Sequence, residues 1–203
     1  MNKRLAVFAI AAALPVSAVA TPQNFAFDPL HTSVSFAIEH LGLSMIHGRF
    51  KKFSGKVTFD QAAKTGNVEF VVDTASIDTN DNDKGNRPRS RDEHLRSADF
   101  FNVAEFPTMT YKSTRVVYNG DTPTTVEGDL TLLGVTKPVA ITIERFRCNP
   151  ATATAKERCG GSATAKIKRA DFGMAWNKTL DSGGVVVGEV VTVTIDVSLV
   201  SRT

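Results

Sequence analysis

Apolar and polar residues alternate with a period of two along most of the chain. Such alternation places every second side chain on one face and predicts half-buried β-strands. The clearest runs cover residues 33–39, 56–59, 68–73, 109–112, 126–132, 139–144, 163–168 and 191–199. Turn-forming residues separate several of these runs, at 64–67, 119–123, 134–138 and 181–184. The pattern therefore predicts about eight strands, each with one apolar face.

Strands with one apolar and one polar face are typical of antiparallel sheets. A single open sheet of such strands would leave two edges unpaired, and closure into a barrel removes both edges. We therefore predict an all-β fold, an eight-stranded antiparallel barrel, with a two-sheet sandwich as the alternative. The interior of a barrel of this size is either filled by side chains or leaves room for one ligand.

The segment 90–109 breaks the alternation. Ser90 and Glu93 have the spacing of a capping box, in which each residue's side chain caps the backbone amide of the other. Acidic residues follow this start and basic residues lie near the end, as the helix dipole favours. We predict a short helix from Arg91 to Ala98 near the opening of the barrel. The charged side chains and phenylalanines of this segment also make it a candidate active site.

Residues 1–20 have the organisation of a secretory signal peptide. Lys3 and Arg4 precede an apolar run that ends in a small-x-small sequence at Ala18–Ala20. Its roughly 12–15 apolar residues are fewer than the ~20 that a membrane-spanning helix needs. We predict cleavage after Ala20, export to the periplasm or beyond, and a single domain over residues 21–203.

Charge and cysteine content fit an exported protein. Loss of Lys3 and Arg4 lowers the basic residues from 24 to 22 against 21 acidic ones, so the net charge falls from +3 to +1. Such a balance does not indicate a nucleic-acid-binding surface. Cys148 and Cys159 are the two cysteines, and we predict a disulfide between them because exported chains favour pairing. A redox-active pair is less favoured, since reactive pairs usually have the spacing C-x-x-C.

Candidate catalytic and metal-binding chemistry is sparse. The histidines at 31, 40, 47 and 94 lack the close ligand spacing of a zinc site. The turn at Asp181–Gly184 resembles the nucleophile loop of serine proteases, but a hairpin loop explains it as well. We predict no catalytic residue, metal or cofactor. Two alternatives stay open: a hydrolase that combines a histidine with Ser182 or uses the charged cluster 91–96, and a structural or interaction module without a ligand.

Eight short motifs occur in order along the chain. They are F-D-x-x-H-T-S-V-x-F at 27–36, H-L-G-x-S at 40–44, G-R-F-x-x-F-x-G at 48–55, A-S-I-D-T-N at 75–80, R-D-x-H-L-R-S-x-D-F-F at 91–101, F-P-T-M at 106–109, G-D-L-T-L-x-G-V-T-K-P at 128–138 and R-x-D-F-G-M at 169–174. Together they resemble the YceI-like family of periplasmic lipid- or polyisoprenoid-binding proteins. The segment with the two cysteines is not part of that pattern.

The resemblance implies a lipocalin-like barrel that holds a long isoprenoid or acyl chain and carries no catalytic activity. Thirteen phenylalanines fit either a packed core or an apolar ligand cavity, and the resemblance favours the cavity. We predict a small amphiphilic lipid as partner: a polyisoprenoid, an isoprenoid quinone or a fatty acyl compound, bound for transport, storage or sequestration. Transient contact with a membrane and a homodimer are compatible with this prediction.

The predicted site combines an apolar lumen with polar groups at the mouth. The lumen candidates on the apolar strand faces are Phe36, Ile38, Phe59, Phe70, Met109, Tyr111, Leu130, Ile141, Ile167, Val193 and Ile195, with Phe172, Met174 and Trp176 at one end. The candidates for contact with a ligand head group are Arg91, Asp92, His94 and Arg96.

Overall fold

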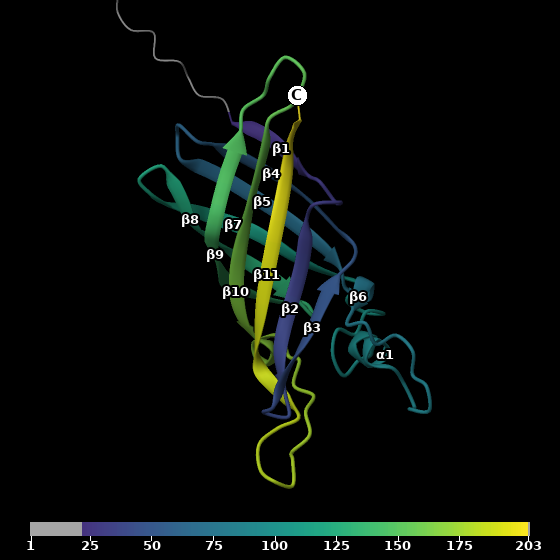
Figure 1. Ribbon diagram of the computed structural model, residues 1–203. Coiled ribbons are helices and arrows are strands. Elements are labelled where there is room, and N and C mark those ends of the chain that lie inside the picture. Colours follow the sequence, from purple (N-terminus) through teal and green to yellow (C-terminus); the bar gives the residue numbers. More distant parts are fainter. Residues whose placement is uncertain (1–21, 203) are drawn as a thin grey trace, which may run out of the picture.

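The computed structural model describes residues 22–202, so the predicted signal peptide lies outside the described residues. Within this range the chain forms eleven strands, one α-helix and two short 3-10 helices (Figure 1). The strands are β1 (Gln23–Phe27), β2 (Ser33–His40), β3 (Ser44–Phe50), β4 (Phe53–Asp60), β5 (Thr65–Asp73), β6 (Ile77–Asp78), β7 (Thr108–Asn119), β8 (Thr122–Leu132), β9 (Val135–Asn149), β10 (Arg158–Lys168) and β11 (Val187–Arg202). The helices are η1 (Thr74–Ser76), α1 (Arg91–Arg96) and η2 (Arg169–Phe172).

Eight of the strands close into an antiparallel barrel. They pair in the order β1-β4-β5-β7-β8-β9-β10-β11, and β11 pairs again with β1. Strand β11 is long enough to serve two partners: its end at 199–202 pairs with β1, and its middle at 191–196 pairs with β2. Strands β2, β3 and β6 extend the sheet from there. The predicted all-β, eight-stranded antiparallel barrel is confirmed.

The predicted strands differ from the barrel strands in detail. The eight predicted runs fall in β2, β4, β5 and β7–β11, whereas the closed ring contains β1 in place of β2. Strands β1, β3 and β6 were not predicted. The predicted turn at 134–138 is also wrong, because β9 already begins at Val135. The turn is made by Leu133 and Gly134, whose φ values of 52° and 73° are those of a two-residue type I′ hairpin loop.

Helix α1 begins where the sequence predicted. The Ser90 hydroxyl accepts a hydrogen bond from the Glu93 amide, and the Glu93 carboxylate accepts one from the Ser90 amide. The helix ends at Arg96, two residues before the predicted Ala98. It lies at the side of the barrel next to β6, as Figure 1 shows. The capping box is therefore confirmed.

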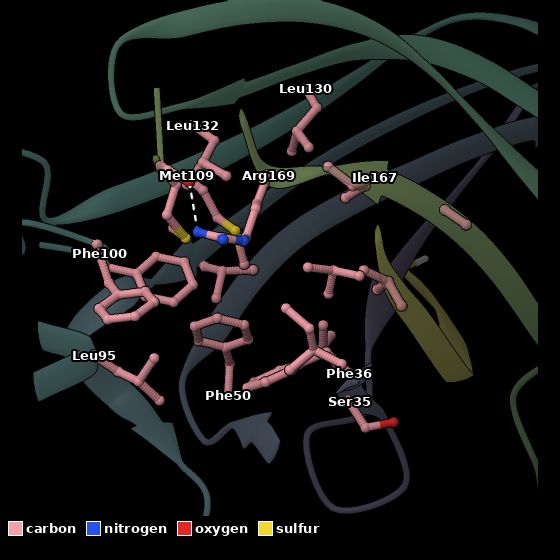
Figure 2. Close-up of a pocket in the computed structure, with 18 of the residues that line it drawn as sticks. Ser35, Phe36, Phe50, Leu95, Phe100, Met109, Leu130, Leu132, Ile167 and Arg169 are labelled. Atoms are coloured by element: carbon pink, nitrogen blue, oxygen red, sulfur yellow. Dashed lines mark hydrogen bonds between the residues drawn. The ribbon is translucent and has the colours of Figure 1, made fainter. Parts of the chain in front are cut away.

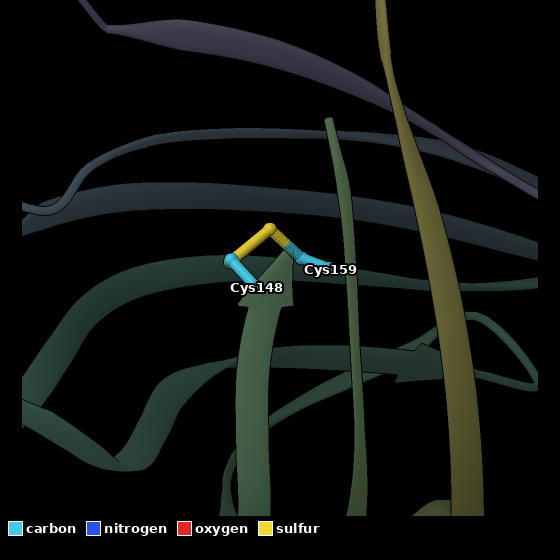
Figure 3. Close-up of a disulfide and its surroundings, with 2 residues drawn as sticks. All are labelled: Cys148 and Cys159. Atoms are coloured by element: carbon cyan, nitrogen blue, oxygen red, sulfur yellow. A yellow bond between two sulfur atoms is a disulfide. The ribbon is translucent and has the colours of Figure 1, made fainter. Parts of the chain in front are cut away.

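The two ends of the barrel differ. At one end the β2–β3 turn and the segment between η2 and β11 project together, while the loop between β9 and β10 lies at the other end (Figure 1). A disulfide joins Cys148 of β9 to Cys159 of β10, which face each other across the two strands (Figure 3). The predicted pairing is confirmed. We refer to the disulfide end as the closed end and to the opposite end as the mouth.

No helix within residues 22–202 combines the length and the hydrophobicity that crossing a bilayer requires.

Candidate ligand-binding cavity

The mouth half of the barrel encloses an apolar cavity of about 290 Å³. Side chains from most barrel strands, from α1 and from the segment after η2 form its wall. In Figure 2, Phe36, Phe50, Leu95 and Phe100 point into the same space as Leu130, Leu132 and Ile167 from the opposite wall. Because so few polar atoms face this space, it suits an apolar ligand.

A second cavity of about 160 Å³ lies next to the first. Four residues, Phe70, Tyr111, Ile141 and Ile195, line both cavities. Alternation along β11 explains the arrangement: Val191, Val193 and Ile195 face the main cavity, while Ile195, Val197 and Leu199 face the second one. The barrel interior is therefore two apolar compartments that meet at a shared waist.

Twelve of the fourteen predicted lumen residues line the main cavity. They are Phe36, Ile38, Phe70, Met109, Tyr111, Leu130, Ile141, Ile167, Met174, Trp176, Val193 and Ile195. Their contact with a ligand stays a prediction. Phe59 and Phe172 do not line either cavity. Phe59 stacks on Phe25 with ring centroids 4.6 Å apart and fills the closed end. Phe172 is almost wholly buried beside Leu130, because its position in η2 turns it into the wall.

Several wall residues were not predicted. Ile46 and Phe50 come from β3, which was itself missed, and Leu95, Phe100 and Phe101 come from α1 and the turn after it. Leu95 could have been predicted, because it is the apolar residue on one face of an otherwise polar helix. Arg169 and His40 also reach the wall, and nothing in the local sequence pattern indicated this.

Two of the four head-group candidates, Arg91 and His94, lie on the cavity wall. The Arg91 guanidinium donates to the hydroxyl of Thr79 at 2.7 Å and to its carbonyl at 2.9 Å. Nε2 of His94 is 2.9 Å from a carboxylate oxygen of Asp99. Its ring meets the ring of Trp176 edge-on at 4.7 Å between centroids. These contacts fix both side chains at the mouth.

The other two candidates, Asp92 and Arg96, fasten α1 to β6 and are absent from the cavity wall. Asp92 is 1% exposed, and one carboxylate oxygen accepts hydrogen bonds from the amide and hydroxyl of Thr79. Arg96 donates to the carbonyls of Ala75 and Ile77. Both side chains are occupied in holding the helix, and their contact with a head group stays a prediction.

A buried guanidinium anchors the segment that completes the mouth. Arg169 is 2% exposed and donates at 2.8 Å to the carbonyls of Met174, Trp176 and Gly188. Its Nη2 is also 3.6 Å from a carboxylate oxygen of Glu189. Figure 2 draws Arg169 at the cavity wall with one of these hydrogen bonds. Its charge is thus matched by carbonyl dipoles and one carboxylate, as a buried cation requires.

Electrostatic effects around the cavity follow from these contacts. The pKa of Asp99 is lowered, first by the hydrogen bond from Arg89 and then by the one to His94. Burial raises the pKa of the Tyr111 phenol. Its hydroxyl lies 3.0 Å from the carbonyls of both Val126 and Val139, so the polar atom points into the wall.

Two places within residues 22–202 bear on catalytic or metal-binding chemistry: the turn at Ser182 and the surroundings of the disulfide. Ser182 is exposed in its turn, and among residues 22–202 no hydrogen bond joins it to a histidine. Cys148, Glu157 and Cys159 lie close enough to share an ion, but the two sulfurs are bonded to each other. As disulfide sulfurs they are not the thiolates that metals bind.

The chain is thus a closed antiparallel barrel with apolar cavities in its interior, an architecture in which some barrels enclose a ligand. Residues 25–199 match the YceI-like domain family, and the chain belongs to that family. It is 41% identical over 165 residues to a UPF0312 protein of Vibrio parahaemolyticus, covering 81% of this chain and 83% of the relative. A UPF0312 protein of Vibrio cholerae is 37% identical over 177 residues, covering 86% and 89% of the two chains.

Solved structures share the fold. The Campylobacter jejuni YCEI protein has a TM-score of 0.60 and 27% identity, covering 82% of this chain and 90% of its own. Burkholderia cenocepacia BcnA has a TM-score of 0.62 and 25% identity, covering 85% and 98%. A polyisoprenoid binding domain from Saccharophagus degradans has a TM-score of 0.58 and covers 88% and 98%. Its 16% identity shows likeness of fold alone.

Proposed function

We propose that this protein binds a long-chain amphiphile, with the apolar tail inside the barrel and the polar head at the mouth. The observation that carries the proposal is a cavity with almost entirely apolar walls, whose few basic lining residues are Arg91 and His94 of α1, Arg169 of η2 and His40 of β2. A polyisoprenoid, an isoprenoid quinone and a fatty acyl compound all have the required shape. One structure of the same fold is a polyisoprenoid binding domain from Saccharophagus degradans, which supports the proposal at the level of the fold.

Burial of the tail supplies the binding free energy. Each methylene taken from water contributes about 0.8 kcal/mol, so ten buried methylenes contribute about 8 kcal/mol. The ligand also loses translational and rotational freedom, which costs at least about 4 kcal/mol. The net binding free energy is therefore favourable for a long chain, whereas for a short chain the burial does not offset the lost freedom.

The head group would meet Arg91 and His94. Arg91 keeps one guanidinium nitrogen 3.9 Å from Asp81, and its side chain is about one third exposed. It therefore retains access to solvent and to a ligand. Arg169 is unsuited to this role, because its N–H groups already face carbonyls and Glu189.

We infer that the protein acts in the periplasm. The predicted signal peptide at 1–20 supports export. The disulfide between Cys148 and Cys159 supports an oxidising compartment, since cytosolic thiols are kept reduced. Transport, storage and sequestration of the ligand are all consistent with this location.

The rim of the mouth supports brief contact with a bilayer during ligand exchange. Five of the six large apolar side chains that are exposed within residues 22–202 lie on this rim: Leu41, Leu43, Met45, Val185 and Val190. The amide of Leu41 donates to Val186, which joins the two parts of the rim. Leu43→Ser should weaken flotation with phosphatidylcholine vesicles. Leu30→Ser, which changes an equally exposed leucine outside the rim, should leave flotation unchanged; equal behaviour of the two variants contradicts the contact.

Trp176 offers a direct test of ligand binding. It is the one tryptophan of the chain and lies on the cavity wall. Addition of a polyprenol, a quinone or a long-chain fatty acid should change its fluorescence saturably. Ala165→Phe should abolish this response, because Ala165 is buried against the main cavity and the larger ring fills the space.

The matched control is Ala62→Phe, which makes the same change at an exposed turn. It should bind like the unmodified protein. Circular dichroism verifies that both variants are folded. A folded Ala165→Phe protein with undiminished binding would overturn the proposal.

A further inference from the structure

The second cavity lies between the waist and the closed end of the barrel. Its wall is formed mainly by apolar side chains, among them Val57, Val68, Ile143, Ala163 and Val197, and also includes Arg145 and Ser162. It adjoins the main cavity at the four shared residues of the waist.

The waist is held in place on two sides. Tyr111 is fixed by its hydrogen-bonding contacts with the wall, and Gly128 leaves room for its ring: a Cβ atom at Gly128 would lie 2.7 Å from that ring. Phe70 stacks on Phe53 with centroids 5.4 Å apart and meets Phe27 edge-on at 4.9 Å. Both rings are thus held in place where the two cavities adjoin.

The closed end forms a floor beneath the second cavity. Phe25 and Phe59 stack in parallel, and Phe146 meets Phe59 edge-on at 5.7 Å between centroids. Phe146 also lines the cavity, and the disulfide between Cys148 and Cys159 packs in the same cluster (Figure 3). A covalent link thus holds β9 and β10 together at the level of the floor.

We propose that the second cavity receives the far end of the ligand tail and sets the longest chain that the barrel accommodates. The inference rests on the proposed function and adds the determinants of chain length: Val197 and Ala163 in the wall, and Phe146 in the floor. For ligand tails that end before the floor, every added methylene increases the affinity. For tails long enough to reach the floor, further methylenes no longer increase the affinity.

The test measures affinity for straight-chain primary alcohols of increasing length, followed by Trp176 fluorescence. In the unmodified protein the affinity should rise about fourfold with each methylene, the factor that corresponds to its burial, and then level off. Val197→Phe should move this plateau to shorter chains and leave the affinity for short alcohols unchanged. Phe146→Ala should move it to longer chains.

Two further variants keep the test decisive. Ala163→Leu fills the same cavity from β10 and replaces Val197→Phe if that protein does not fold. Ala62→Phe adds the same ring at an exposed turn that lines neither cavity, so its plateau should match the unmodified protein. Saturable binding with the same plateau in every variant overturns the inference and leaves the proposed function standing. Absence of saturable binding in the unmodified protein overturns both.

Discussion

Arg169 should be the most consequential single side chain of the mouth. It reaches across from η2 and holds the carbonyls of Met174, Trp176 and Gly188 at 2.8 Å each. Replacement by methionine keeps a long apolar side chain and removes every donor. Three carbonyls then lose their partner, one in a buried hydrogen bond and two in partly buried ones.

The size of the effect follows from these contacts. A hydrogen bond from a charged donor contributes about 1.5–3 kcal/mol, so three contribute about 5–9 kcal/mol if the segment stays in place. The segment can instead move away and expose its carbonyls to water, which limits the loss. We expect Arg169→Met to lower the free energy of unfolding by about 3–5 kcal/mol, the range for breaking a buried charged interaction.

Urea unfolding followed by circular dichroism measures this loss, and Trp176 fluorescence reports the segment itself. Emission should move to longer wavelength, because Trp176 loses its place against His94 and Phe100. The control is Arg115→Met, which removes two hydrogen bonds of 2.9 Å to Glu127 at the exposed surface. Such exposed pairs contribute at most about 1 kcal/mol. An Arg169→Met protein as stable as this control, with unchanged emission, would refute the reasoning.

Three other perturbations test the surrounding framework. Asp78 has a pKa lowered from 3.8 to about 2, chiefly by the hydrogen bond from Lys51, so its stabilisation is present above about pH 4 and is lost as the pH falls toward 2. Asp78→Asn should flatten this part of the stability–pH curve in urea titrations, and an unchanged slope argues against the assignment. Replacing both cysteines with serine should cost about 3 kcal/mol, given their separation of 11 residues; a thermal midpoint insensitive to reductant contradicts this. Gly128→Ala forces a Cβ atom against the Lys112 backbone carbonyl and to within 2.7 Å of the Tyr111 ring, and should cost about 1–3 kcal/mol in urea unfolding; an unchanged midpoint would mean that both the ring and the neighbouring strand shift without cost.

The barrel was predictable because the alternation of side chains is a local property of each strand. Eight runs had it clearly, and all eight are strands. The ring itself was not predictable in full, because closure depends on β1, which is five residues long, and on β11 pairing with two partners. Partner choice is a long-range property that no local pattern records.

The site residues, too, include some that a local pattern predicts and others that it does not. Strand residues that face the lumen, such as Val193 and Ile195, could be identified from the alternation and do line the cavity. The sequence did not show which charged residues of α1 line the cavity and which hold the helix in place. Arg91 and Asp92 are neighbours, yet the first lines the cavity and the second is buried. Adjacent side chains of a helix point about 100° apart, so Arg91 lines the cavity while Asp92 is buried, although both contact Thr79. Arg169 was missed because its role depends on carbonyls 5 to 19 residues away.

The central claim is that the barrel holds an amphiphile with a long apolar tail. Native mass spectrometry of the protein purified from the periplasm of its own host tests this claim directly, followed by organic extraction of the bound material. We predict an added mass that extraction removes, identified as an isoprenoid, a quinone or an acyl compound, and missing from folded Ala165→Phe protein. A population without added mass, unchanged after incubation with each of these three ligand classes, would contradict the account.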